Sequence, residues 1–152
     1  MSLYGKQETK DRLILASRLS EISRVAGWVE ALAAQYIISA NIQLSINLCL
    51  EETLANVIRH GYGEGADRAV SVNFTMPREA FFVFTVEDEA PHFNPLAGPE
   101  LSALHPDEEF RVGGQGIRFL RRFADLLEYE ATPAGNRLRI GFTGAQTSAA
   151  AE

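Results

Sequence analysis

Three polar residues on one predicted helix are the first candidates for chemistry. Glu52, Asn56 and His60 follow one another at intervals of four residues, so a helix places them in one row. The row lies away from the apolar stripe of Leu50 and Leu54, and an asparagine in the middle of a helix is unfavourable by propensity. A solvated helix face would explain each residue alone, so the row needs support from other parts of the chain.

A second candidate, Asp88, follows an apolar stretch and opens a loop. Residues 81–86 are apolar on both faces, which is typical of a central strand. Loops at strand ends often carry ligand-binding groups. Asp88 can accept a hydrogen bond from an exocyclic amine in an apolar pocket, although aspartate is also an ordinary residue at the start of a loop.

A third candidate is the run Gly113-Gly114-Gln115-Gly116, which precedes a helix expected to begin near Gly116. Glycines at this position let backbone N–H groups approach an anion, and the start of a helix favours negative charge. The run lacks the Gly-Lys-Ser/Thr ending of a Walker A loop. Glycine-rich loops are frequent, so this run is also weak when taken alone.

Alternating and helical periodicities predict the elements that must position these residues. We expect a strand near residues 13–15, a helix over 20–36 capped by Ser20, and a second helix over 43–60. Strands over 70–76 and 81–86, an irregular stretch over 89–112, a third helix and a hairpin of 129–132 with 138–142 follow. This order predicts an α+β two-layer sandwich, in which three helices cover one face of a mixed, mostly antiparallel five-stranded sheet.

Size and composition restrict the class of protein. A chain of 152 residues with 46% hydrophobic and 22% charged residues fits one globular domain. We expect it to span residues 10–143, with flexible ends at 1–9 and 144–152. The net charge of −6 argues against direct binding of nucleic acid, and the apolar stretches are too short for a membrane span. The single cysteine and the N-terminus without an apolar signal core fit a cytoplasmic protein.

Together the three candidates match one family. Glu52-Thr53-Leu54-Ala55-Asn56-Val57-Ile58-Arg59-His60-Gly61-Tyr62 resembles the N box of the GHKL ATPases, in the form found in anti-sigma-factor serine/threonine kinases. Residues 88–95 resemble the first glycine box of that family, residues 113–125 resemble the second box and its helix, and Gly135-Asn136-Arg137-Leu138 fits the ending. The resemblance covers residues 10–143 and implies a Bergerat-type ATP-binding fold, with an ATP lid over about 89–112.

The resemblance also implies roles for single residues. Asn56 would coordinate Mg²⁺ on the ATP phosphates, in keeping with the oxygen ligands that Mg²⁺ prefers. Glu52 would activate a serine hydroxyl or a water, while Glu51 is a competing carboxylate about 100° around the helix. Asp88 would bind the adenine amino group. His60 would either face the phosphates or hold the helix end by a hydrogen bond.

Further nucleotide contacts follow from the same resemblance, which assigns them to Ala90, Pro91, Phe93, Gly113, Gly114, Gln115, Gly116 and Ile117. Two residues depart from the family pattern. Ala90 replaces a glycine, which strains the chain if the backbone there needs a positive φ but fits if the glycine only permits close approach. Asn94 replaces the usual aspartate.

The family further implies partners. These are a sigma factor or similar regulator, a small antagonist protein that bears the phosphorylated serine, and a second copy of the chain in a homodimer. Arg24 is a candidate partner contact, and a solvated arginine is the competing interpretation. We expect Trp28 in the core or at a dimer interface, Cys49 in packing, and His92 and His105 at the surface.

Two other functions compete with the kinase. One is a non-catalytic nucleotide-binding module that acts by capturing a partner, which the alanine at position 90 favours. The other is the catalytic half of a histidine kinase, whose phosphoacceptor helices would have to precede residue 10, where we expect no room for them.

Overall fold

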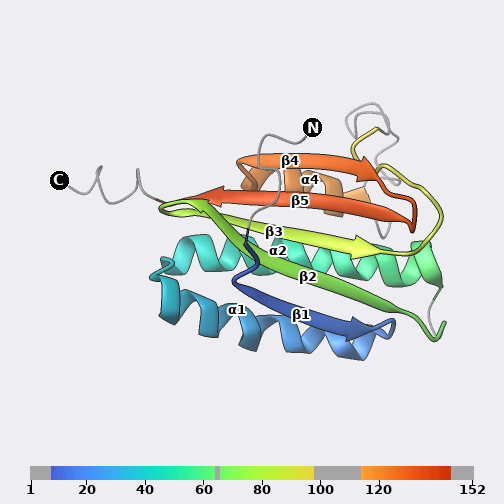
Figure 1. The fold of residues 1–152 in the computed structure, drawn as a ribbon, viewed down its shortest axis with the longest axis horizontal. Helices are drawn as coiled ribbons and strands as arrows, with labels where there is room; N and C mark the ends of the chain where they lie inside the picture. The colour runs from blue at the N-terminus through green and yellow to red at the C-terminus, as the bar shows by residue number, and fades with distance from the viewer. Residues whose placement is uncertain (1–7, 64–65, 98–113, 145–152) are drawn as a thin grey trace.

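A single antiparallel sheet organises the computed structural model, which describes residues 8–63, 66–97 and 114–144, with 114–117 in their backbone alone (Figure 1). The strand order is β1-β2-β3-β5-β4, and all four ladders are antiparallel. The strands are β1 (Asp11–Ala16), β2 (Ala69–Arg78), β3 (Phe81–Asp88), β4 (Leu126–Ala131) and β5 (Asn136–Thr143). The predicted fold class is confirmed, including the central place of the strand that ends in Asp88.

Three helices cover one face of this sheet, as predicted (Figure 1). They are α1 (Ser23–Tyr36), α2 (Ala40–Asn56) and α4 (Gly114–Phe123). The strands alternate, so every second side chain points toward the helices. The inward set from the inner strands is Val70, Val72, Phe74, Phe82, Phe84, Val86, Leu138, Ile140 and Phe142, all buried. This apolar layer and the helices form the two layers of the sandwich.

The helix starts differ from those predicted. A 3-10 helix, η1 (Leu19–Ile22), comes first and contains Ser20, so α1 begins only at Ser23 and has no side-chain cap. The prediction that Ser20 caps the first helix is therefore wrong. α2 begins earlier than expected because the Ser39 hydroxyl accepts a hydrogen bond from the Ile42 amide at 3.3 Å, which is an ordinary N-cap. Across the described ranges, no helix combines the length and apolarity that crossing a bilayer would require.

The second predicted helix changes character at its end. α2 stops at Asn56 and continues as a π-helical turn, η2 (Val57–Tyr62). Such π-turns occur often at functional sites. Gly63, with a φ of 85°, ends the turn. Asn56 and His60 thus lie on opposite sides of a change in helical winding, which simple periodicity did not predict.

The core contains the residues expected in packing. Cys49 is fully buried on α2. Trp28 packs against the core with its ring edge-on to Phe84, at a centroid distance of 5.9 Å, and its indole N–H points to the Asp11 carboxylate at 3.3 Å. Arg24 is exposed on α1, where it donates to the Ile14 carbonyl at 3.0 Å and pairs with Glu21 at 2.9 Å.

Candidate functional site

A cavity of about 480 Å³ opens between η2 and the ends of strands β3 and β5. This volume lies within the range of small-molecule sites. Most of its walls are apolar, and polar groups are few and separated. The described residues that line it are Thr53, Asn56, Val57, His60, Gly61, Val86, Asp88, Ala90, Pro91, His92, Phe93, Pro95, Leu120, Tyr129, Asn136 and Leu138.

On the α2 side, two residues that line this cavity each carry a buried oxygen without a hydrogen-bond partner among the described residues. These oxygens are Oδ1 of Asn56 and the hydroxyl oxygen of Thr53. Burying a polar atom without a hydrogen bond costs about 1–3 kcal/mol, so each such atom in a folded protein calls for an explanation. Asn56 thus carries, on a residue that lines the cavity, an unpaired amide oxygen of the kind that a hard cation such as Mg²⁺ prefers. The described residues include no group of three or more His, Cys, Asp or Glu side chains that could hold a metal alone, so a cation here would need ligands from a phosphate or water.

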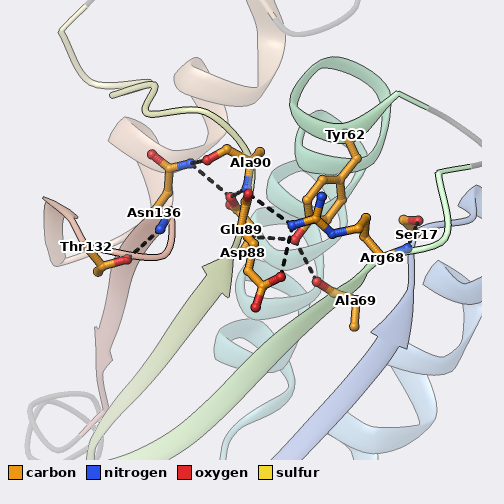
Figure 2. Close-up of polar contacts among 10 residues, drawn as sticks. Ser17, Tyr62, Arg68, Ala69, Asp88, Glu89, Ala90, Thr132 and Asn136 are labelled. Carbon is orange, nitrogen blue, oxygen red and sulfur yellow. Dashed lines mark hydrogen bonds and ion pairs between the residues drawn. The ribbon is translucent and has the colours of Figure 1, made fainter.

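At the opposite side, the last residue of β3 presents a carboxylate. Asp88 is only 9% exposed. Its Oδ1 accepts two hydrogen bonds at 2.9 Å, one from the Ala90 amide and one from the Asn136 side chain (Figure 2). The described residues give its Oδ2 no hydrogen bond, so this oxygen can accept one from a ligand in the cavity.

The backbone after Asp88 is also held from the other side, by the end of η2 (Figure 2). The Tyr62 hydroxyl accepts a hydrogen bond from the Glu89 amide at 2.6 Å and donates one to the Ala69 carbonyl at 2.8 Å. Burial raises the pKa of Tyr62, which keeps this hydroxyl protonated and able to donate. Arg68 pairs with the Glu89 carboxylate at 2.9 Å and lies 5.2 Å from the centre of the Tyr62 ring. Tyr62 therefore ties the helix that carries Asn56 to the loop that follows Asp88.

Ala90 fits the loop without backbone strain. Among the described non-glycine residues only Ile37 and Ala80 have a positive φ, so the first of the two possibilities raised for this alanine does not apply. Its side chain is buried and faces Gly61, where an added Cβ would lie 3.1 Å from the Ala90 methyl. The absence of a side chain at Gly61 makes room for the methyl of Ala90.

The row of polar residues is divided by the structure. Asn56 and His60 line the cavity, while Glu52 is not among the described residues that do. Glu52 is half-buried one turn before Asn56 on α2. Its neighbour Glu51 does not line the cavity either, and burial raises the pKa of Glu51.

The glycine run is described only in part. Helix α4 begins at Gly114, two residues earlier than expected. Gly113 and most of the expected lid, residues 98–112, lie outside the described residues, as does His105. The same holds for the side chains of Gln115 and Ile117. Leu120, further along α4, is buried and closes one wall of the cavity.

Several lining residues were missed from the sequence. His92, which we expected only at the surface, is exposed but lines the cavity, and its Nε2 lies 2.8 Å from the Thr132 carbonyl oxygen. Pro91 and Phe93 line the cavity as expected, and Phe93 is 71% exposed at its margin. The signal for Asn136 was present, because it follows the glycine of a family-like ending.

Comparisons with known proteins agree with this geometry. Residues 15–142 match the family described as the histidine kinase-like ATPase domain. The chain is 22% identical over 130 residues to the serine/threonine-protein kinase BtrW of Bordetella bronchiseptica, with 86% of this chain and 91% of that protein covered.

Two solved structures from a blue-light activated histidine kinase of Erythrobacter litoralis share the fold at 17% identity. The histidine kinase domain gives a TM-score of 0.52, over 97% of this chain and 69% of that one. The other structure gives 0.53, over 86% of this chain and 42% of that one, so the present chain spans less than half of it.

Proposed function

The chain belongs to the histidine kinase-like ATPase domain family, and on that premise we propose that it is an ATP- and Mg²⁺-dependent serine kinase that regulates a sigma factor or similar protein. One observation carries the proposal. Asn56, whose amide oxygen has no hydrogen-bond partner among the described residues, and Asp88 line one largely apolar cavity, the first from α2 and the second from the end of β3. A nucleotide has a matching distribution of groups, with an amine-bearing flat base at one end and phosphates at the other.

The base occupies the apolar part of the cavity in this proposal. Val57, Val86 and Leu138 supply walls for a flat ring, and Oδ2 of Asp88 accepts a hydrogen bond from its exocyclic amine. The phosphates extend toward Asn56, whose Oδ1 would ligate Mg²⁺, and toward the start of α4 at Gly114. The bound Mg²⁺ would supply charge neutralisation for the phosphates.

Glu52 is the proposed general base. The serine oxygen of the protein substrate forms a bond to the γ-phosphorus, the bond from that phosphorus to the β–γ bridging oxygen breaks, and ADP leaves. The serine proton passes to the Glu52 carboxylate. Glu52 lies one helical turn before Asn56 on α2 and is not among the described residues that line the cavity. This position suits a group that acts on the hydroxyl of an incoming protein and not on the nucleotide base.

The protein substrate in this proposal is a small antagonist with an accessible serine. The regulator bound by the chain is a sigma factor or a related protein, and the chain acts as a homodimer. The name of the Bordetella relative, a serine/threonine-protein kinase, supports the choice of a protein hydroxyl as acceptor. Arg24, exposed on α1, is the proposed regulator contact.

The position of Glu52 also favours a second candidate, a module that binds ATP but captures its partner without phosphorylating it. A carboxylate that does not line the cavity can be a solvated helix residue. Ala90 no longer supports this alternative, because its backbone is unstrained.

A transfer assay separates the two candidates. The chain is incubated with γ-labelled ATP, Mg²⁺ and a small serine-bearing antagonist encoded beside it, and label on the antagonist is measured. The kinase proposal predicts transfer that falls by about 10²–10⁴-fold in Glu52→Ala, while Glu51→Ala, one residue away on another side of α2, retains it. Tight ATP binding without transfer would select the capture module, and undiminished transfer in Glu52→Ala would refute the role of this residue.

Binding of the nucleotide is tested separately by calorimetry with ATP and Mg²⁺. Asp88→Ala removes a charged hydrogen bond worth about 1.5–3 kcal/mol, so its affinity for ATP should be about tenfold to a hundredfold lower. Unchanged affinity would remove Asp88 from the site.

A further inference from the structure

We infer that Asn136 is a positioning residue, which holds the Asp88 carboxylate so that a single oxygen faces the ligand and thereby sets a preference for 6-amino over 6-oxo purine nucleotides. The inference rests on the proposed function, in which Asp88 accepts a hydrogen bond from the base. It adds a residue for which sequence reasoning found no role.

The amide nitrogen of Asn136 donates to the segment that forms the base end of the cavity. It lies 2.9 Å from Oδ1 of Asp88, 3.2 Å from the Ala90 carbonyl and 3.1 Å from the Pro91 carbonyl. Figure 2 shows the Asn136 side chain reaching this segment from the opposite side to Tyr62. The nitrogen thus contacts both the carboxylate and the backbone that follows it.

The amide oxygen of Asn136 is equally engaged. It accepts hydrogen bonds from the Phe93 amide at 2.9 Å and from the Tyr129 hydroxyl. Turning the amide over would set its nitrogen against the Phe93 N–H and its oxygen against three acceptors, so only the contact with the Tyr129 hydroxyl, which can also accept, would survive. Asn136 is only 8% exposed, so its orientation is defined by the protein and not by solvent.

The turn between β4 and β5 presses on the same segment through its backbone. A Cβ placed on Gly135 would lie 2.1 Å from the Asp88 carbonyl oxygen and 2.6 Å from the Glu89 Cα. Only a residue without a side chain permits this approach. This close backbone contact fixes the position of Asn136, which is the first residue of β5 and lies directly opposite Asp88 in the ladder.

The consequence concerns the chemistry that the carboxylate can recognise. Oδ1 of Asp88 is occupied by the Ala90 amide and Asn136, which leaves Oδ2 as the acceptor for a ligand. A 6-amino purine offers a donor to this oxygen. A 6-oxo purine would bring its own carbonyl oxygen against it, and a site built to hydrogen-bond one group rejects an analogue that cannot form the bond.

The test measures the ratio of affinities for ATP and for inosine triphosphate, both with Mg²⁺, by titration calorimetry on the whole chain. Asn136→Asp keeps the shape and the accepting oxygen but replaces the donor with a second carboxylate beside Asp88. We expect the preference for ATP to fall at least tenfold in Asn136→Asp and partly to return in Asn136→Ser, which has a hydroxyl donor.

Thr132→Val is the matched control. It removes the hydroxyl that accepts a hydrogen bond from the Gly135 amide in the same turn, with an N–O distance of 2.8 Å. This hydroxyl makes no hydrogen bond to Asp88. We expect it to keep the wild-type ratio. A merely structural role of Asn136 would weaken both nucleotides alike, so an unchanged ratio in Asn136→Asp overturns the inference.

If Asn136→Asp does not fold, Asn136→Ala decides in its place, because full retention of the wild-type ratio in a variant with a normal melting temperature would overturn the inference equally. Failure of the proposed function has a different result. In that case the wild-type chain itself binds neither nucleotide or shows no preference between them.

Discussion

At the scale of single residues, a polar side chain at the cavity can lower the stability of the folded protein and still be needed for ligand binding. Asn56 places a buried amide oxygen where no described residue hydrogen-bonds it. A protein selected only for stability would replace such a side chain with an apolar one. The cost in the folded state is explained if the oxygen is kept for a ligand.

Asn56→Leu should therefore separate stability from binding. The leucine has the same branching but no polar atom, so we expect the free energy of unfolding of the ligand-free protein to be unchanged or higher by up to about 1–3 kcal/mol. Mg²⁺-dependent ATP affinity should be lost. Urea unfolding and calorimetry measure the two quantities.

Asn47→Leu is the control for this substitution. Asn47 lies on the same helix and also has a buried oxygen without a described partner, but it does not line the cavity. We expect a similar effect on stability and unchanged ATP affinity. Equal loss of affinity in both variants would contradict a specific role for Asn56.

Sequence reasoning identified individual site residues well where a motif names them, and poorly where only the fold brings them together. Asn56, His60 and Asp88 were predicted from spacing and resemblance, and all three line the cavity. His92 was expected at the surface because it has no partner at a spacing that suits a metal, and it is exposed, but its place in the cavity lining was not predicted. Its contact with Thr132 joins residues 40 positions apart, which periodicity cannot reveal.

At the scale of elements, the π-helical turn η2 is the part that most influences the site. It places Gly61 against Ala90 and Tyr62 against the Glu89 amide. Periodicity predicted one continuous helix here, because a π-turn inserts no residue type that is absent from α-helices. The type and order of the long elements were predictable, whereas this local change in winding depended on packing against the strand-end loop.

The contact between Gly61 and Ala90 should appear as an energetic coupling. Gly61→Ala adds a methyl 3.1 Å from that of Ala90, and overpacking of this kind typically costs about 1–3 kcal/mol. In an Ala90→Gly background the added methyl has room, so the cost should largely disappear. A double-mutant cycle of unfolding free energies measures the coupling, expected at about 0.5–3 kcal/mol.

Helix propensity acts in the opposite direction in this experiment. Replacing a glycine within a helix by alanine gains up to about 1 kcal/mol. If Gly61→Ala proved equally stabilising in both backgrounds, the contact would be unimportant and propensity would account for the result.

At the scale of the whole molecule, all the helices that the structure describes lie on one face of the sheet (Figure 1). The other face is the outward face. Charged side chains occupy part of this outward face. Arg137 pairs with Glu87 at 2.5 Å and with Glu130 at 3.1 Å, and Arg139 lies 3.5 Å from Glu130. These pairs are half-buried at the surface of the sheet, where ion pairs typically contribute little, about 0–1 kcal/mol each when exposed. We expect the apolar layer beneath the helices to contribute more.

Cys49, inside that layer, should make the stability of the whole domain depend on alkaline pH. Burial raises the pKa of its thiol from 9.0 to about 12. The folded state keeps the proton while the unfolded state loses it near pH 9. The contribution is therefore fully present below pH 9 and declines as the pH rises from 9 toward 12, by up to about 1.4 kcal/mol per pH unit.

Urea unfolding of the wild type and of Cys49→Ala between pH 8 and 10.5 tests this dependence. Other groups that titrate in this range affect both proteins alike. The wild type should lose stability more steeply than the variant, whose core lacks the thiol. Parallel curves would show that the thiolate is not excluded from the folded state.

The position of β5 has a consequence for how the protein is made. Among the described residues β5 is the last strand along the chain, yet it lies inside the sheet, between β3 and β4, and it begins with Asn136. While a ribosome is still synthesising residues 136–143, β3 lacks one of its two neighbouring strands, and Asp88 lacks the hydrogen bond from the Asn136 side chain. The contact between Asp88 and Asn136 therefore forms only after β5 has been synthesised, so this wall of the cavity is completed after the strands β1 to β4 are already present.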